Sequence, residues 1–363
     1  MVLVRPVSID DLDQLLELAG QAGVGLTTLP SDRDLLKRRV LKSQRSIDNI
    51  PERPGGESFM FVMEDAETKK IVGASGVVSK VGGFEPFYAY RIENQPLDSD
   101  FLKVHRQIPV LHLVREHDGP AEVGSLFLSP DYRKKDYGRF LQLVRFLFVA
   151  EYPQAFEQEI VSELRGVIDE QGHSAFWDAV GKHFFGIDFP RADYLSVVNK
   201  KFIADLMPRH PIYVPLLPPE AQRVIGKVHE SSKPALKNLE AEGFGFNNLV
   251  DIFDAGACVS CQRDHIRTVR HSRSAVVEKV LDNPIDSPTY MIGCFTPDFR
   301  ATCGGVRVLE TDGIAIETKV ASLLNASVGT TLRYVSLRPG PEPVRERRAE
   351  PRASQKRVSN ESD

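Results

Sequence analysis

The sequence predicts an α+β protein in which a mixed sheet is flanked by helices and followed by a small C-terminal β module. Three observations carry this prediction. Residues 3–78 give the order strand, helix, helix, strand, strand. Residues 121–150 combine a short apolar run, a basic turn and a long segment with helical periodicity. Residues 290–337 are rich in β-branched residues and glycine, a composition that favours strands and turns.

The first elements follow from local patterns near the N-terminus. Residues 3–6 suit a short edge strand, and Pro6 is expected to end its ladder because proline donates no backbone hydrogen bond. Ser8 and Ser31 each precede a helical pattern with apolar residues on one face. Serine is a favoured N-cap, so we expect these two residues to begin two helices.

Two strands and an insertion come next. Residues 58–64 and 71–78 are apolar runs separated by a polar turn, which predicts an antiparallel hairpin. Residues 82–120 follow as a long insertion with several aromatic side chains. We expect this insertion to cover one side of a functional site.

The chain is organised around residues 121–150. An apolar run at residues 121–128 suits a buried strand, and the basic residues Arg133 to Lys135 precede a long helix that has Gly138 near its start. The first N–H groups of a helix have no intrahelical acceptor, and the helix dipole adds partial positive charge there. This turn therefore predicts an anion site, and a glycine lets a phosphate approach the backbone. These residues alone leave open a solvated basic turn on another α/β fold.

The second half of the chain has shorter elements. Residues 160–168 suit another buried strand, and residues 233–243 a helix with Gly243 as its C-cap. Residues 221–229 suit a further helix, and residues 247–256 an extended segment closed by a turn.

Composition excludes several classes of protein. Hydrophobic residues make up 42% and charged residues 26%, which is ordinary for a globular protein with a full core. The net charge of −4 favours no nucleic-acid partner. No apolar run is long enough to span a bilayer, and the first residues have no signal-peptide pattern. We therefore expect a cytoplasmic protein with no membrane partner.

The four cysteines allow two interpretations. Cys258 and Cys261 have the spacing of a zinc-ligand pair, and two histidines follow within ten residues. Cys294 and Cys303 are too widely spaced to form the matching pair. We favour reduced thiols and expect no metal.

Two motifs resemble the Gcn5-related N-acetyltransferase superfamily. Residues 133–138 resemble its acyl-CoA signature, Arg/Gln-x-x-Gly-x-Gly/Ala, except that Asp136 replaces the first glycine. A carboxylate beside a pyrophosphate is unfavourable, so either Asp136 points away or the loop differs. Residues 176–185 resemble a second signature, in which a tyrosine often protonates the departing thiolate. Trp177 stands there and has no proton to give, so we expect it to pack in the core and the general acid to lie elsewhere.

Longer strings lie at residues 25–30, 126–135, 165–172, 176–185, 206–213, 226–229 and 248–256. Together they resemble one family, the arginine N-succinyltransferases, from about Val4 to about Val335. The resemblance implies an acyl-CoA N-acyltransferase-like mixed sheet and the reaction of succinyl-CoA with L-arginine to give CoA and N2-succinyl-L-arginine. This reaction begins arginine catabolism by the succinyltransferase pathway. Succinyl-CoA is then a co-substrate, with no permanently bound cofactor.

The resemblance also implies roles for individual residues. His229 would be the proton donor, and a histidine exchanges protons near neutral pH. The alternative for His229 is a histidine at a helix C-terminus, beside the last carbonyls of residues 221–228. Leu126 would bind succinyl-CoA through its backbone. The other residues expected at the succinyl-CoA site are Leu128, Arg133, Lys134 and Gly138.

Substrate recognition and assembly stay open at this point. A guanidinium needs a planar carboxylate partner, and the succinyl carboxylate needs a cation. The candidates are Asp169, Glu170, Asp251 and Asp254 for the first and Arg91 and Arg165 for the second. Ornithine is an alternative acceptor. We expect a homo- or hetero-oligomer, and in a hetero-oligomer this chain is one of the subunits. A non-catalytic sensor of acyl-CoA or arginine is the other hypothesis, supported by Asp136.

We divide the chain into four parts. Residues 1–200 form the acyl-CoA N-acyltransferase-like core, and residues 201–289 the second part of the catalytic region, which carries His229. Residues 290–337 form the β module. Residues 338–363 contain almost no apolar side chains and are expected to be disordered.

Overall fold

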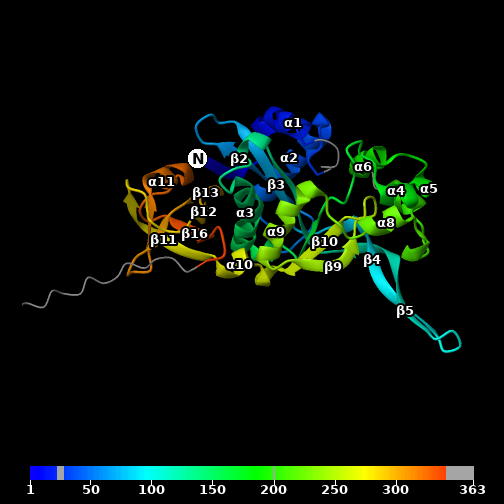
Figure 1. Ribbon diagram of the computed structural model, residues 1–363. Helices are drawn as coiled ribbons and strands as arrows, with labels where there is room; N and C mark the ends of the chain where they lie inside the picture. Colours follow the sequence, from blue (N-terminus) through cyan, green and yellow to red (C-terminus); the bar gives the residue numbers. More distant parts are fainter. Residues whose placement is uncertain (23–27, 199–200, 341–363) are drawn as a thin grey trace, which may run out of the picture.

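A computed structural model describes residues 1–22, 28–198 and 201–340. Residues 25–27 of the first family string and residues 341–363 of the predicted tail lie outside the described residues. The described strands join one continuous sheet (Figure 1), in the order β14-β15-β11-β16-β12-β13-β1-β2-β3-β6-β7-β10-β9-β4-β5-β8. This arrangement agrees with the predicted α+β class.

The predicted N-terminal hairpin is confirmed. β2 (Ser58–Asp65) and β3 (Ile71–Val78) pair antiparallel over most of their length. The prediction of an edge strand for β1 (Val2–Pro6) is wrong, because β1 pairs with β2 on one side and with β13 (Arg300–Gly304) on the other. Pro6 is the last residue of β1 and lies opposite Phe61 at the end of this ladder, as predicted. β13 arrives about 300 residues later in the chain, so no local pattern reveals it.

Two helices cover one face of this part of the sheet (Figure 1): α1 (Leu12–Gly20) and α2 (Arg33–Asp48). Ser8 caps a short 3-10 turn that leads into α1, as predicted. For α2 the cap is Asp32 rather than Ser31, because the Asp32 carboxylate accepts the Leu35 N–H at 2.8 Å. The two residues are adjacent and are both favoured caps, so spacing alone does not separate them.

The central strand and helix form as predicted. β6 (Ala121–Leu128) leads through the basic turn into α3 (Tyr137–Glu151), which lies on the face of the sheet opposite α1 and α2. Alternation along β2 serves both layers, since Phe59 and Phe61 pack toward α3 while Met60 packs toward α1 and α2. α3 packs into the largest apolar core of the described chain.

The order of strands leaves a fork beside β6. β7 (Glu159–Glu163) runs parallel to β6, and the two strands pair only at Ala121 with Ile160 and at Glu122 with Val161. On its other side β7 pairs with β10 (Ala257–Gln262) along its whole length. From about residue 123 onward, this edge of β6 therefore pairs with none of the described strands.

The predicted insertion is a long hairpin of β4 (Gly82–Ser99) and β5 (Val104–Asp118) that projects from the body of the protein (Figure 1). Its base pairs with β9 (Gly245–Val250) and carries a second core. Trp177 is fully buried in that core, and its Nε1 donates to the Ile187 carbonyl at 2.9 Å, so the core-packing prediction is confirmed. The elements around this core are α4 (Ala175–Ala179), α5 (Gly181–Phe185), α6 (Phe189–Val198), α7 (Lys201–Leu206), β8 (Ile212–Tyr213) and α8 (Pro219–Val224).

The C-terminal strands extend the sheet at its other end. They enclose their own core around α11 and meet the rest of the protein where β13 pairs with β1, at Ala301 with Val4. The predicted Gly243 cap ends α9 (Lys233–Glu242) with a φ of 103°. The remaining elements are α10 (Arg267–His271), β11 (Arg273–Leu281), β12 (Tyr290–Cys294), β14 (Val306–Val308), β15 (Ile314–Glu317), α11 (Thr318–Leu324) and β16 (Thr331–Ser336).

No helix in the described ranges is both long enough and apolar enough to span a membrane. The four cysteines are unpaired, and three of them are buried. Within the same ranges, no three His, Cys, Asp or Glu side chains are grouped so that they could hold a metal ion.

Candidate active site

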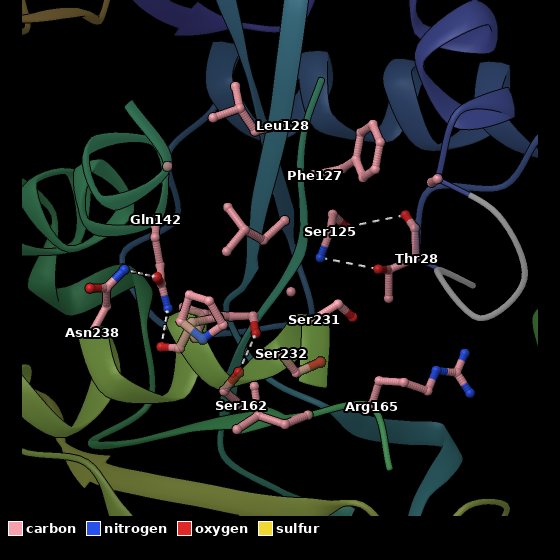
Figure 2. Close-up of a pocket in the computed structure, with 18 of the residues that line it drawn as sticks. Thr28, Ser125, Phe127, Leu128, Gln142, Ser162, Arg165, Ser231, Ser232 and Asn238 are labelled. Atoms are coloured by element: carbon pink, nitrogen blue, oxygen red, sulfur yellow. Dashed lines mark hydrogen bonds between the residues drawn. The ribbon is translucent and has the colours of Figure 1, made fainter. Parts of the chain in front are cut away.

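A cleft of about 960 Å³ opens at the fork between β6 and β7. Its walls come from β6, the turn and first residues of α3, the end of β7, and residues 231–238. Figure 2 shows Ser125 and Thr28 on one side and Gln142 and Asn238 on the other. Every residue expected at the succinyl-CoA site lines this cleft: Leu126, Leu128, Arg133, Lys134 and Gly138. The insertion does not cover it, because no described residue of β4 or β5 lines the cleft.

A bulge in β6 forms the middle of the cleft. The register with β3 slips between Gly124 and Phe127, and Ser125 has a φ of 53°. Thr28 stabilises the bulge (Figure 2), because the Ser125 N–H donates to Thr28 Oγ1 and the Ser125 hydroxyl donates to the Thr28 carbonyl, both at 3.1 Å. Leu126 follows directly, on the strand edge that β7 leaves unpaired. A ligand with amide groups can pair with such an edge as a strand would.

A buried arginine supports this bulge from α3. Arg145 donates to the carbonyls of Gly76 and Gly124 at 3.1 and 3.0 Å and to the Gln142 carbonyl at 2.8 Å. Burial lowers the pKa of its guanidinium to about 9. The bulged strand is thus fixed on both faces, by Thr28 and by Arg145. This fixing holds the β6 backbone in place for a ligand.

The basic turn forms one end of the cleft. Arg133 folds back over the Phe127 ring and donates through Nε to the Leu128 carbonyl at 3.1 Å, which ties the turn to β6. Lys134 lies over the Tyr132 ring. A Cβ added at Gly138 would meet only Leu128 Cδ2, at 3.7 Å, so the protein does not crowd this position. The open space at the start of α3 suits a phosphate.

Acidic side chains form the other end. Arg165 donates to Asp193 at 3.0 Å and to Asp254 at 3.1 Å. Asp254 also accepts the N–H groups of Gly166 and Gly256 at 2.9 and 2.8 Å. All three of these side chains line the cleft, together with Asp251. Three aspartates thus surround one guanidinium, so this end favours a cation.

The electrostatics of this end follow from burial and crowding. Burial opposes the charge of Arg165, but the neighbouring aspartates outweigh it and raise its pKa. Burial also raises the pKa of Asp193. For Asp251, burial and the nearby charge of Asp254 together raise the pKa to about 7. Asp251 Oδ1 accepts the N–H groups of Phe253 and Asp254 at 2.7 and 2.9 Å, which fixes the orientation of its carboxylate.

The structure places His229 beside the cleft rather than in its lining. α8 ends at Val224, so the alternative of a histidine at a helix C-terminus is wrong. His229 instead caps the 3-10 turn Glu230–Ser232, and its own N–H donates to the Arg165 carbonyl at 2.8 Å. Its ring contacts Ser231, which lines the cleft, with Nδ1 2.7 Å from the Ser231 hydroxyl.

The tautomer of His229 follows from this cap. The Ser231 backbone N–H donates to Nδ1 at 3.2 Å. A backbone N–H can only donate, so Nδ1 accepts and neutral His229 carries its proton on Nε2. Nε2 is then the nitrogen from which a proton can be given.

Three of the candidates for substrate recognition lie elsewhere. Asp169 binds the N–H groups of Gln171 and His173 in its own loop and lines a separate, smaller pocket. Neither Glu170 nor Arg91 is among the residues that line the large cleft. Asp251, Asp254 and Arg165 therefore remain as the candidates that the cleft brings together.

Several lining residues had not been expected. Gln142 donates to the Ala235 carbonyl and accepts from Asn238 at 2.8 Å, which ties α3 to α9 across the cleft (Figure 2). Gln142 and Arg145 interrupt an otherwise apolar stretch of α3, and this interruption was a usable signal in the sequence. Asp193 had no such signal, since only tertiary packing brings α6 to the end of β7.

Comparison with known proteins agrees with this architecture. The family model for the arginine N-succinyltransferase beta subunit matches residues 2–268, and the model for its C-terminal domain matches residues 273–336. Arginine N-succinyltransferase from Yersinia pestis (strain Pestoides F) is 41% identical over 350 residues, which cover 93% of this chain and 98% of that protein. Arginine N-succinyltransferase subunit beta from Pseudomonas aeruginosa is 39% identical over 337 residues, with the same two shares.

A solved structure matches over the same extent. Arginine/ornithine succinyltransferase subunit AI from Pseudomonas aeruginosa has a TM-score of 0.85 and 33% sequence identity, covering 93% of this chain and 99% of that one. The family resemblance and the fold class predicted from the sequence are both confirmed. This chain belongs to the arginine N-succinyltransferase family of acyl-CoA-dependent N-acyltransferases.

Proposed function

We propose that this protein transfers the succinyl group of succinyl-CoA to the α-amino group of L-arginine. The products are CoA and N2-succinyl-L-arginine, and the reaction is the first step of arginine catabolism by the succinyltransferase pathway. The observation that carries the proposal is a single cleft with a cationic end and an acidic end, joined by an unpaired strand edge. The two substrates carry the matching charges, phosphates on one and a guanidinium on the other.

Succinyl-CoA enters as a co-substrate along β6. Its phosphates bind at the start of α3, near Gly138, where Arg133 and Lys134 supply positive charge. Its pantetheine amides pair with the β6 backbone at Leu126 and Leu128, the edge that β7 leaves unpaired. This path leads the thioester to the bulge at the middle of the cleft. No permanently bound cofactor is part of the proposal.

L-arginine binds at the acidic end. A guanidinium prefers a planar carboxylate that can accept two parallel hydrogen bonds. Asp193 and Asp254 already bind Arg165, whereas Asp251 accepts only backbone N–H groups, on Oδ1, among the described residues. We therefore assign the guanidinium to Asp251. Arg165 is the cation of this end that suits a substrate carboxylate.

The chemical step needs one proton to move from the amine to the sulfur. The neutral α-amino group attacks the thioester carbon, a C–N bond forms, the C–S bond breaks, and the leaving thiolate takes up a proton. We assign His229 as the donor of that proton: its imidazolium form gives the Nε2 proton to the sulfur, and the proton released by the amine restores that form. Trp177 has no role in this step, because it is buried in the core.

Asp136 stands where the acyl-CoA signature has a glycine, but its carboxylate forms an ion pair with Arg338. This substitution therefore no longer favours a non-catalytic sensor. Ornithine remains the alternative acceptor. We also propose a homo- or hetero-oligomer in the cytoplasm, a reducing compartment that suits four unpaired cysteines.

Thiol release from succinyl-CoA tests the proposal, with L-arginine as acceptor and with acetyl-CoA and L-ornithine as controls. We expect rapid release only when succinyl-CoA and arginine are both present. Release with ornithine in place of arginine would keep the chemistry and reassign the acceptor. CoA binding without release in any combination would contradict the proposal and favour a sensor or a chain that is inactive without a partner subunit.

A further inference from the structure

Asp136 is the one residue of the phosphate turn whose charge opposes a phosphate. It adopts a φ of 61°, a left-handed conformation that aspartate tolerates better than most residues. Its carboxylate accepts two hydrogen bonds from Arg338, from Nη2 at 2.6 Å and from Nε at 3.1 Å. Arg338 lies two residues after β16 and 202 residues after Asp136 in the chain. The C-terminal part of the chain therefore neutralises Asp136.

The pair leaves much of the Arg338 guanidinium unused. A guanidinium has five N–H donors, and Asp136 occupies two of them. Nη1 of Arg338 is thus held in a fixed orientation next to the start of α3. The parallel N–H groups of a guanidinium match the oxygens of a phosphate.

A second arginine, Arg139, lies near the start of α3. Arg139 lines the cleft, and its Nη1 is buried without a hydrogen-bond partner among the described residues. Burial and the charge of Arg338 lower the pKa of Arg139, while Asp136 and Glu242 oppose that shift. Asp136 is bound to Arg338 and Glu242 is bound to Arg267. The two nearby carboxylates therefore have partners, and the cations Arg139 and Arg338 lie close enough to repel each other, a repulsion that another anion would relieve.

We propose that Arg338 binds a phosphate group of acyl-CoA and that Asp136 is the positioning residue that holds its guanidinium there. The end of the C-terminal sheet thereby completes a phosphate site that begins in the turn before α3. This inference rests on the use of acyl-CoA in the proposed function. The phosphate is either the 3′-phosphate or the pyrophosphate of CoA, and both present the same oxygens to the guanidinium.

Binding of CoA to the full-length protein tests this inference without any acceptor. Calorimetric titration of wild type and Arg338→Gln with CoA and with dephospho-CoA, which lacks the 3′-phosphate, gives the affinities. Arg33→Gln is a matched control, because Arg33 makes a similarly short and exposed pair with Asp13, and Asp13 does not line the cleft whereas Asp136 does. Arg338→Lys keeps the positive charge but loses the parallel N–H donors of the guanidinium. Thermal midpoints of all variants report whether folding has changed.

We expect Arg338→Gln to weaken CoA binding about fivefold, a moderate effect because the Arg338 side chain is 65% exposed. Arg338→Lys should recover part of that loss, and Arg33→Gln should bind as wild type does. If the contacted group is the 3′-phosphate, dephospho-CoA binds wild type and Arg338→Gln equally. If it is the pyrophosphate, both ligands weaken by the same factor.

Equal CoA affinities for wild type, Arg338→Gln and Arg33→Gln would overturn the inference. The proposed function is tested separately by turnover. A wild type that binds CoA through Arg338 but releases no thiol with arginine would leave the inference standing and contradict the function. A wild type that binds no CoA would overturn both.

Discussion

The two ends of the cleft are built in different ways. The residues of the cationic end that line the cleft come from one continuous stretch, from Arg133 to Arg139 at the start of α3. The acidic end is assembled from three separate segments: Arg165 after β7, Asp193 on α6, and the turn between β9 and β10 that holds Asp251 and Asp254. The comparison teaches that a site made by one local motif can be predicted from sequence, whereas a site made by tertiary packing cannot.

The largest expected effect is on kcat and comes from His229, the proposed proton donor. His229→Asn keeps a favoured cap residue but has no proton to exchange near neutral pH. We expect kcat to fall by about 10²- to 10³-fold, the usual contribution of a general acid, while CoA affinity stays as in wild type. Steady-state kinetics and calorimetry measure the two quantities.

His173→Asn is the matched control for this variant. His173 also binds a neighbour through Nδ1, the Asp169 carboxylate at 3.1 Å, but it lies outside the large cleft. It should leave kcat unchanged. A near-normal kcat for His229→Asn would show that His229 is not the proton donor.

The acidic end should be the more fragile of the two. Asp254 is almost fully buried and accepts from Arg165 and from two backbone N–H groups. Asp254→Asn places an NH2 group against one of these donors and leaves Arg165 with one carboxylate fewer. We expect a loss of about 2–4 kcal/mol in the free energy of unfolding, measured by urea denaturation.

Asp188→Asn serves as the comparison for Asp254→Asn. Asp188 is exposed, and among the described residues its carboxylate accepts only the Arg191 N–H, at 3.1 Å, so the loss should stay below about 1 kcal/mol. Equal losses in the two variants would show that the network around Arg165 adds no stability.

The cationic end should be the more tolerant. Arg133 and Lys134 are exposed and lie on Phe127 and Tyr132, so their replacement should cost little stability beyond the Arg133 hydrogen bond to the Leu128 carbonyl. The double variant Arg133→Gln, Lys134→Gln should raise KM for succinyl-CoA about three- to tenfold and leave KM for arginine unchanged. Steady-state kinetics with each substrate varied in turn measures this. A change in the arginine KM alone would contradict the assignment of the two ends.

The same contrast explains which parts of the fold the sequence could predict. The β2–β3 hairpin, β6 and α3 all depend on local apolar spacing and nearby turns, and they form as expected. The edge-strand prediction for β1 failed because its second neighbour, β13, lies at the other end of the chain. Long-range pairing of this kind leaves no local pattern.

The site divides in the same way. The turn residues Arg133, Lys134 and Gly138 were found by their motif and lie together in the cleft. Asp251 and Asp254 could be named as charged residues, but their meeting with Asp193 depends on how α6 packs. The position of His229 beside Ser231 was also missed, since helix periodicity continued to residue 229 while α8 ends at Val224.

Asp251 connects binding to stability at the acidic end. Its pKa rises to about 7 in the folded protein, above about 3.9 in an unfolded chain, so the folded state binds the proton more tightly. The stability from this group is present below about pH 4 and is lost as pH rises through 7. Asp251→Asn should therefore be more stable than wild type by about 1–2 kcal/mol at pH 8, and the gain should shrink toward pH 5. Urea denaturation at the two pH values measures it.

The most direct test of the account is the pair of Michaelis constants for Asp251→Asn at pH 8. The amide oxygen of the substituted side chain can still accept both backbone N–H groups, so the turn keeps its shape. Loss of a charge-assisted pair with the guanidinium should raise KM for L-arginine about tenfold or more, with KM for succinyl-CoA unchanged. An unchanged KM for arginine in this folded variant would contradict the claim that the acidic end of the cleft binds the acceptor.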